Sequence, residues 1–212
     1  MYGNTKFAYG NVYTSLGIVL ILCIAVSNMV FGNEIGNHTL KNTISYGISR
    51  KSIFLGKLIV QVIYAAISLI IILTIYSIST ELLLDSSGSA EFIRMLRACA
   101  AAFPLLVAGL TITNCFVFNM KSIGSVITAF IIMVAVPFVI NILALKFDFF
   151  QTIAKYIPLD ILMYNTFDEK ADMVKMYWDT NSGFITCWIV GIVWTLAFII
   201  IGYSAFSKKE IK

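Results

Sequence analysis

The segment Gly32–Val60 reads "GNEIGNHTLKNTISYGISRKSIFLGKLIV" and separates two long apolar stretches of the chain. It is mostly polar before its last turn, and it carries four of the fifteen basic residues. The chain as a whole is 59% hydrophobic and only 12% charged, with a mean hydropathy of +0.91. A soluble domain carries about 25% charged residues, so this composition predicts a protein whose surroundings are mostly lipid.

Five apolar runs are each close to the ~20 residues that a helix needs to cross a hydrocarbon core of ~30 Å. None of them contains an internal Lys, Arg, Asp or Glu. Their continuous hydropathy favours helices over barrel strands, in which apolar and polar residues alternate. We therefore expect an all-α, polytopic transmembrane helix bundle in one domain, residues 1–212. The expected segments are spans at about 13–31, 58–80, 98–118, 123–145 and 184–206, an inner loop at 32–57 and an outer loop at 146–183.

The loops predict an orientation. If the 32–57 segment faces the cytosol, the turn at 119–122 and the tail at 207–212 face it too, and the N-terminus lies outside. The inner pieces then hold eight of the fifteen basic residues in about half the length of the outer pieces, and nine of the eleven acidic residues lie outside. Short basic loops stay in the cytosol. We expect a multi-pass protein of a bacterial cytoplasmic membrane with a cytosolic C-terminus.

The outer loop divides into two halves. In the first half Phe150, Ile153 and Ile157 fall at helical spacing before Pro158, which predicts an amphipathic helix lying in the outer interface. The helix is either a plain anchor or a lid over a substrate path. The second half is acidic, and we expect it to be solvated, with Trp178 marking the interface.

The sequence offers little chemistry. His38 is the single histidine, no zinc-protease motif is present, and "GISRKSIFLGK" lacks both the glycine spacing and the hydroxyl of a P-loop. The four cysteines show no metal-type spacing. Ion-driven carriers need an ionisable group at bilayer depth, and the five spans contain none. Neutral groups such as Gln61 and Asn114 usually bond between helices. We expect neither an enzyme nor a cofactor or metal of the chain's own.

The inner loop has a local pattern of helix, turn and helix. Leu40 and Ile44 are four residues apart, as on one face of a short helix. Gly47 suits the left-handed position that closes a helix, and Ser49 suits the N-cap of a second one. That second helix runs through Ile53 into the span that begins at residue 58.

Apolar side chains of this loop are expected to protrude among basic ones. In one interpretation the loop is a helical hairpin on the inner leaflet, with its lysines on lipid phosphates. In the other it docks onto a soluble partner that supplies the work. The protruding residues are Leu40, Ile44, Tyr46 and Ile48.

The loop resembles the first cytoplasmic loop of ABC transporter permeases of the type-two exporter family, in particular the bacitracin and lantibiotic self-immunity permeases of Gram-positive bacteria. The tail "GYSAFSKKEIK" and the segment "KYIPLDIL" of the outer loop are similar to the same permeases. The residues that carry the likeness are Glu34, Thr39, Lys41, "GISR" at 47–50, Ile53 and Lys57.

The resemblance implies a coupling helix that seats in a groove of a separate cytosolic ATPase. ATP and Mg²⁺ then belong to that ATPase, a second permease chain completes the pathway, and nucleic acid is not a partner. The cargo is expected to be a drug, peptide antibiotic or lipid-like molecule, with a role in antibiotic resistance or bacteriocin immunity. The implied coupling residues are Glu34, Leu40, Ile44, Tyr46, Gly47, Ile48, Ser49, Arg50, Ile53 and Lys57.

Permeases of this family have six spans, whereas five are visible here. The family's first span and the amphipathic helix before it have no counterpart, so we expect a shortened form. Two alternatives lie outside this class: a membrane anchor or assembly subunit that moves nothing, and a channel. A channel is the weaker alternative because no charged ring or selectivity loop is visible.

Overall fold

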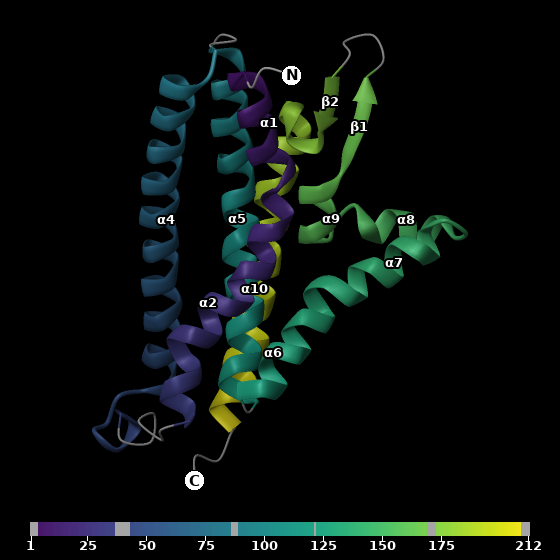
Figure 1. Cartoon of the computed structure of the whole chain (residues 1–212). Helices are drawn as coiled ribbons and strands as arrows, with labels where there is room; N and C mark the ends of the chain where they lie inside the picture. Colours follow the sequence, from purple (N-terminus) through teal and green to yellow (C-terminus); the bar gives the residue numbers. More distant parts are fainter. Residues whose placement is uncertain (1–3, 37–42, 86–88, 121, 169–172, 209–212) are drawn as a thin grey trace.

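The structure, a computed structural model, is a helix bundle that carries one small hairpin, and it describes residues 4–36, 43–85, 89–120, 122–168 and 173–208 (Figure 1). The predicted all-α class is confirmed. The elements are α1 (Thr5–Thr14), α2 (Leu16–Gly36), α4 (Arg50–Leu83), α5 (Ala90–Asn119), α6 (Ser122–Phe130), η1 (Ile131–Ala135), α7 (Val136–Ala144), α8 (Asp148–Ala154), α9 (Pro158–Met163), β1 (Asn165–Asp168), β2 (Met173–Met176), η2 (Tyr177–Asp179) and α10 (Asn181–Lys208).

Four described helical stretches are long and apolar enough to cross a membrane, and α1 with α2 makes a fifth if the bent pair counts as one span. The four are α4, α5, the stretch 124–144 and α10, and each covers or nearly covers a predicted span. The first predicted span, 13–31, instead crosses a 52° bend. The Thr14 hydroxyl donates to the Gly10 carbonyl at 2.9 Å next to this bend, a side-chain bond that often bends helices.

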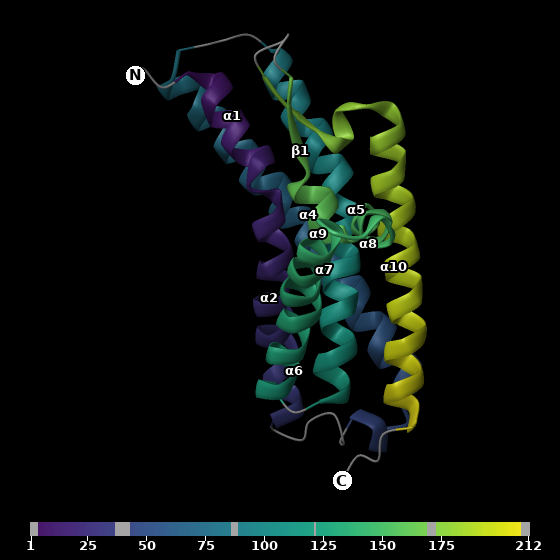
Figure 2. The same cartoon turned by 90° about the vertical axis from the view of Figure 1, so that its right-hand side faces the viewer.

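The bundle has two ends. The N-terminus, the connection between α4 and α5, and the β-hairpin lie at one of them, which we call the N-terminal end (Figures 1 and 2). The turn before α4, the turn between α5 and α6, and the end of α10 lie at the other, the C-terminal end. The sequence predicts that these three segments lie on the same side of the membrane. In the structure they lie at the same end of the bundle. Which end faces the cytosol stays a prediction.

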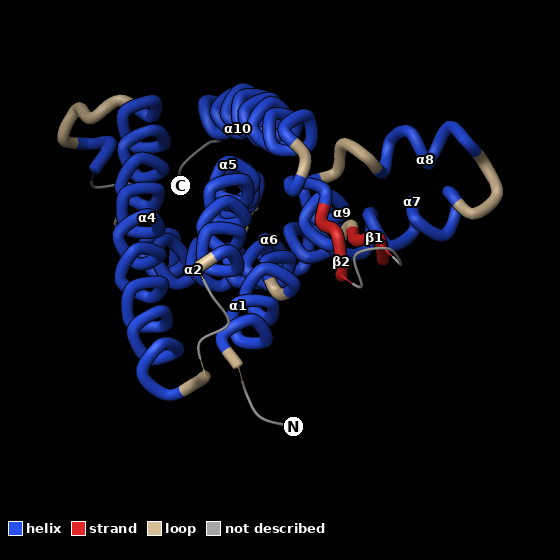
Figure 3. Tube along the Cα trace, turned by 90° about the horizontal axis from the view of Figure 1, so that it is seen from above, coloured by secondary structure: helices blue, strands red, loops and turns tan. Residues whose placement is uncertain are grey.

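Helix α5 occupies the middle of the bundle and contacts α1, α2, α4, α6, α9 and α10 (Figure 3). Its core stretch is rich in Ala, Gly and Thr, whose small side chains let neighbouring helices approach closely. Helix α10 lies close against it at Gly191: a Cβ there would lie 2.6 Å from the backbone carbon of Pro104. Pro104 itself lies inside α5 without ending the helix.

The fourth predicted span, 123–145, is interrupted. Helix α6 passes through the π-helical turn η1 into α7, and Pro137 follows directly in the first turn of α7. Proline lacks an N–H and its ring conflicts with the carbonyl four residues earlier. A π-turn is one way in which a helix accommodates that conflict.

The outer loop differs from its prediction. Pro158 is the first residue of α9 and so begins a second short helix after α8. The predicted solvated half contains β1 and β2, which pair antiparallel with Asn165 opposite Met176. Trp178, predicted at the interface, is fully buried, and its carbonyl accepts a hydrogen bond from Arg97 of α5 at 3.1 Å. The prediction for Trp178 was wrong because the hairpin folds this residue back onto α5.

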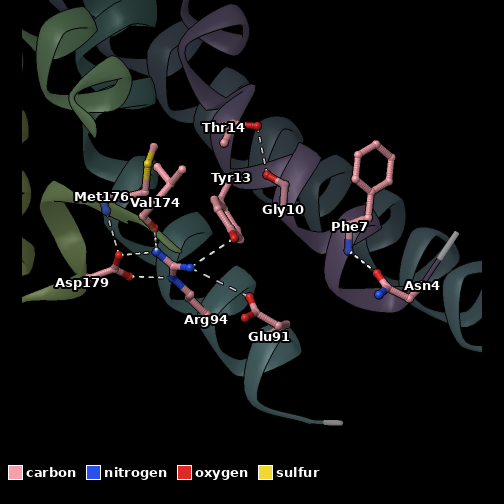
Figure 4. A network of polar contacts seen from close by, with 10 residues as sticks. All are labelled: Asn4, Phe7, Gly10, Tyr13, Thr14, Glu91, Arg94, Val174, Met176 and Asp179. Atoms are coloured by element: carbon pink, nitrogen blue, oxygen red, sulfur yellow. Dashed lines mark hydrogen bonds and ion pairs between the residues drawn. The ribbon is translucent and has the colours of Figure 1, made fainter. Parts of the chain in front are cut away.

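An arginine of α5 attaches the hairpin to the bundle at the N-terminal end (Figure 4). Arg94 forms a two-pronged ion pair with Asp179 at 2.5 and 3.0 Å, and donates to the Tyr13 hydroxyl and the Val174 carbonyl. The Met176 amide donates to the same carboxylate. Burial alone would raise the pKa of Asp179, but the hydrogen bonds from Arg94 and Met176 and the nearby arginine charges lower it on balance.

Candidate functional site

The turn before α4 is formed as the sequence predicts. Gly47 has a positive φ of 85°, and its amide donates to the Ile44 carbonyl at 2.9 Å. An added Cβ at Gly47 would meet no described atom within 4 Å, so glycine is required here by backbone conformation and not by space. Ser49 is the N-cap of α4, and its hydroxyl accepts from the Ser52 amide at 3.1 Å. Both predictions, for Gly47 and for Ser49, are confirmed.

A small aromatic core holds the base of α4. Ile53 and Phe54 are buried there with Val117, Phe118 and Phe206. The Phe118 ring lies between the other two rings, with centroids 5.2 Å from Phe54 and 5.1 Å from Phe206. The start of α4 is thereby joined to the last turns of α5 and α10. Ile53 is an anchor inside this core, not a surface residue.

Arg50 joins α4 to the end of α10 more directly. Its guanidinium donates to the carbonyls of Phe206 at 2.8 Å and Ser207 at 2.9 Å, and lies 5.8 Å from the centre of the Phe206 ring. The last carbonyls of a helix lack intrahelical partners and carry partial negative charge, so a cation is stabilising there. Sequence reasoning placed Arg50 on a docking surface. In the structure it acts first as a clamp between two helices of its own chain.

A second polar contact lies beside this clamp. The Asn119 amide at the end of α5 donates to its own helix at Cys115 and to the Gly202 carbonyl of α10 at 3.2 Å. Sequence reasoning missed Phe206, Ser207 and Asn119. For Phe206 and Ser207 the sequence signal was the similarity of the tail "GYSAFSKKEIK" to exporter permeases. That similarity does not indicate which residues the tail contacts.

Exposed side chains surround the turn before α4. Tyr46 is 87% exposed and Ile48 is 47% exposed, and Lys51 lies exposed on the first turn of α4. We call Tyr46 and Ile48 the docking patch, and Lys51 lies next to it. Ile44 is partly buried against the aromatic core, so of the apolar side chains expected to protrude, Tyr46 and Ile48 do.

The remaining predicted residues are less informative. Lys57 is half-buried on α4, one turn beyond Ile53. Glu34 belongs to α2 by its backbone, but its side chain lies outside what the structure describes, and so do Leu40, Thr39 and Lys41. In the described parts of the chain, no group of three or more His, Cys, Asp or Glu residues could hold a metal ion.

Comparison with known proteins adds no relative to this description. No protein-family model matches the chain, and no curated protein sequence matches it.

Proposed function

We propose that the chain is the membrane-spanning permease subunit of an ATP-binding-cassette exporter of the type-two family. A separate cytosolic ATPase subunit binds ATP and Mg²⁺, and a second permease chain, identical or related, completes the pathway across a bacterial cytoplasmic membrane. The cargo class is a drug, peptide antibiotic or lipid-like molecule. The chain itself contributes no ATPase site, since its sequence has no P-loop.

The observation that supports this proposal is the construction of the docking patch and α4 as one lever. The patch is held by the Gly47 turn and the Ser49 cap at the start of α4, which continues for 34 residues. Its sequence contains no proline that would break the rod. A force on the patch would therefore move the whole helix. A solvated loop or a lipid-bound hairpin does not need such a stiff connection.

The Arg50 clamp gives the lever two positions. While Arg50 holds the Phe206 and Ser207 carbonyls, α4 and α10 move together; when it lets go, they move separately. Transport driven by nucleotide requires an element with two arrangements that the partner biases differently. In this proposal the C-terminal end faces the cytosol, in agreement with the excess of basic residues in its loops.

The docking patch is tested by retention of the ATPase. The chain is co-expressed with the P-loop protein encoded next to it, and the ATPase captured with the tagged chain is measured at matched membrane expression. Replacing Tyr46 and Ile48 together by Ala should lower the affinity roughly 30-fold or more, since two interface side chains are worth about 1–2 kcal/mol each. The matched control replaces Ile63 and Tyr64, which are similarly exposed on the spanning part of α4, and should retain the ATPase. Equal retention by both variants would reject the patch.

The Arg50 clamp is tested separately. Arg50→Gln should retain the ATPase but reduce transport per ATP hydrolysed, because docking is intact and the link to α10 is lost. Lys51→Gln is the control: it removes a neighbouring exposed charge without touching α10. If Arg50→Gln loses the ATPase and Lys51→Gln does not, Arg50 is a docking residue and the lever is wrong. If Arg50→Gln transports normally, the clamp has no role in coupling.

A further inference from the structure

The segment that follows α7 packs against the bundle through α9. The indole N–H of Trp194 donates to the Tyr156 carbonyl at 2.9 Å, and Trp194 is the fourteenth of the 28 residues of α10. Leu159 and Leu162 of α9 are buried, and a Cβ on Gly17, near the bend between α1 and α2, would lie 2.7 Å from Met163. Helix α9 thus packs beside the middle of the bundle, whereas α8 projects from the bundle next to α7 (Figures 1 and 2).

This position brings charged residues beside the middle of α10. Asp160 of α9 and Lys155, which follows α8 directly, lie in the segment whose Tyr156 carbonyl accepts from Trp194. An ionisable residue inside the bilayer is costly for a membrane protein and usually marks a binding or transport site. The five apolar runs of the sequence contain no ionisable residue, and Asp160 belongs to none of them.

A cavity of about 470 Å³ opens at this place between α7, α8, α9 and Tyr177. Ligand pockets occupy about 300–1,000 Å³ and are mostly apolar with a few polar groups. This one has that composition: a single carboxylate and a single ammonium among amide, aromatic and aliphatic side chains. Its lining residues are Asn141, Ala144, Gln151, Ala154, Lys155, Asp160, Ile161, Met163, Tyr164 and Tyr177.

The Asp160 carboxylate is only half satisfied. One of its oxygens accepts from the Asn141 amide at 2.6 Å. The other is shielded from solvent and accepts no hydrogen bond from any described residue, and no described cation forms an ion pair with the carboxylate. Burial raises the pKa of Asp160, and the Asn141 hydrogen bond offsets part of that rise. Asp160 is half-buried, and a shielded carboxylate oxygen without a counter-ion is unfavourable, so this site favours a ligand that brings a cation.

Two tyrosines complete the site. The rings of Tyr164 and Tyr177 stand edge to face with centroids 5.9 Å apart, and both line the cavity. Aromatic faces attract cations, most strongly when the cation is desolvated. The other polar group nearby, the Gln151 amide, already donates to the Ala144 carbonyl at 3.0 Å.

We propose that the cavity between α7, α8 and α9 binds a lipophilic cation, an apolar molecule carrying one ammonium or phosphonium charge, with the Asp160 carboxylate as its counter-ion. Lys155 is exposed and is the basic side chain of the lining. An anionic ligand would pair with Lys155 instead of Asp160, and the experiment below distinguishes the two cases. The site needs no ATPase, so it stands or falls independently of the proposed function.

The test uses the purified chain in phosphatidylcholine nanodiscs and radiolabelled tetraphenylphosphonium, with empty nanodiscs as background. Saturable binding is expected, and Asp160→Asn should weaken it at least tenfold while keeping an acceptor for Asn141. Asp148→Asn is the matched control, because Asp148 is an exposed acid of α8 outside the cavity, and its affinity should not change. Lys155→Gln should bind equally or more tightly. Tetraphenylborate, matched in size but anionic, should bind more weakly than the phosphonium.

Acidification provides a measurement that needs no variant. Protonation of Asp160 removes the counter-ion, so tetraphenylphosphonium affinity should fall as the pH is lowered, at a pH above that for an exposed aspartate. The other charged or titratable side chains that line the cavity are Lys155, Tyr164 and Tyr177. Unchanged binding by Asp160→Asn, pH-independent binding by the wild type, or a preference for tetraphenylborate that Lys155→Gln abolishes would each overturn the proposal.

Discussion

Helices α4 and α5 are both long and apolar, but they are used in opposite ways. Over its most apolar 18 residues α4 has a mean hydropathy of 2.7, and only 11% of those residues are buried within the protein. The corresponding values for α5 are 1.9 and 83%. The less hydrophobic helix is therefore the central one. In a membrane, hydropathy says that a helix can enter lipid but does not say what it packs against.

Side-chain size explains the difference. The buried part of α5 is built from small residues around Ala101 and Gly109, which let neighbouring backbones come close. The exposed part of α4 is built from isoleucines such as Ile67 and Ile71, which fill space without allowing close approach. Helix α4 is held mainly near its ends, by the aromatic core at Phe54 and by the Tyr76 hydroxyl, which donates to the Ala8 carbonyl at 2.7 Å.

The largest expected difference comes from truncating one apolar side chain on each helix. Leu105 of α5 is fully buried, whereas Ile67 of α4 is 52% exposed. Leu105→Ala should destabilise the chain by about 3 kcal/mol because it leaves a cavity, which lowers the melting temperature by roughly 6–12 °C in a chain of this size. Ile67→Ala should change stability by less than about 0.5 kcal/mol.

Both variants can be followed through the cysteines. Cys23, Cys99, Cys115 and Cys187 are free and buried, so a fluorogenic maleimide reacts with them as the protein unfolds. The melting temperature of each variant is compared with that of the wild type in the same detergent. Similar losses for Leu105→Ala and Ile67→Ala would mean that α4 packs on protein over its whole length, and the comparison would fail.

The next largest effect is expected from adding one methyl group. At Gly191, which faces α5, a new Cβ would lie 2.6 Å from the Pro104 carbonyl carbon and 2.7 Å from its oxygen. Gly191→Ala should cost about 2 kcal/mol because backbone atoms cannot move aside easily. At Gly56 of α4 a Cβ meets no described atom within 4 Å, so Gly56→Ala should stabilise the helix by up to about 1 kcal/mol. In the same measurement, the melting temperature should fall for Gly191→Ala and rise for Gly56→Ala.

A smaller effect is expected at the ion pair that anchors α5. Asp179→Asn should cost about 1.5 kcal/mol, the lower end for a hydrogen bond to a charged group. The folded state lowers the pKa of Asp179 below its ordinary 3.8. The carboxylate therefore stabilises the fold above about pH 4, and this stabilisation is lost as the pH falls through the folded-state pKa.

The melting temperature of the wild type should accordingly fall on acidification more than that of Asp179→Asn. On α4 the comparable carboxylate is Glu81, which is exposed and accepts from the Tyr9 hydroxyl at 2.8 Å. Glu81→Gln keeps an acceptor and should change stability by no more than about 0.5 kcal/mol. Equal losses of stability for Asp179→Asn and Glu81→Gln would show that the ion pair of Asp179 stabilises the fold no more than the exposed contact of Glu81.

The smallest effect concerns the direct polar bond between the two helices. The Asn114 amide of α5 donates to the Gln61 side-chain carbonyl of α4 at 2.5 Å, and both residues are buried. The sequence predicted such a bond between helices for residues of this kind. A double-mutant cycle with Gln61→Leu and Asn114→Leu should give a coupling energy of about 0.6 kcal/mol, and no more than about 1.7. A larger value would show that α4 depends on this one contact.

Local patterns were enough to predict the features that depend on a few neighbouring residues. The left-handed Gly47, the Ser49 cap and the continuation of α4 into a span all follow from backbone sterics and from hydrogen bonds three residues apart. The placement of four spans follows from lipid as solvent, because every apolar run of this length must satisfy its backbone internally as a helix.

Other features could not be predicted because they join residues far apart in the sequence. Arg50 clamps a helix end 156 residues away, and its basic side chain alone gives no indication of that partner. Trp178 is buried because a hairpin returns it to α5. Asp160 lies beside the middle of the bundle because its segment packs near Gly17 and Trp194, although the sequence predicts an outer loop there.

The sequence by itself determined that the chain is all-helical, where its runs long and apolar enough to cross a membrane lie, and how the turn before α4 is built. Each of these follows from the transfer of apolar side chains to lipid or from the conformation of a few adjacent residues. The tertiary structure decided which helix is central, which arginine is a clamp, and which carboxylate lines a cavity. Those outcomes depend on how closely two helices can approach, and that distance is set jointly by side chains that the sequence places far apart.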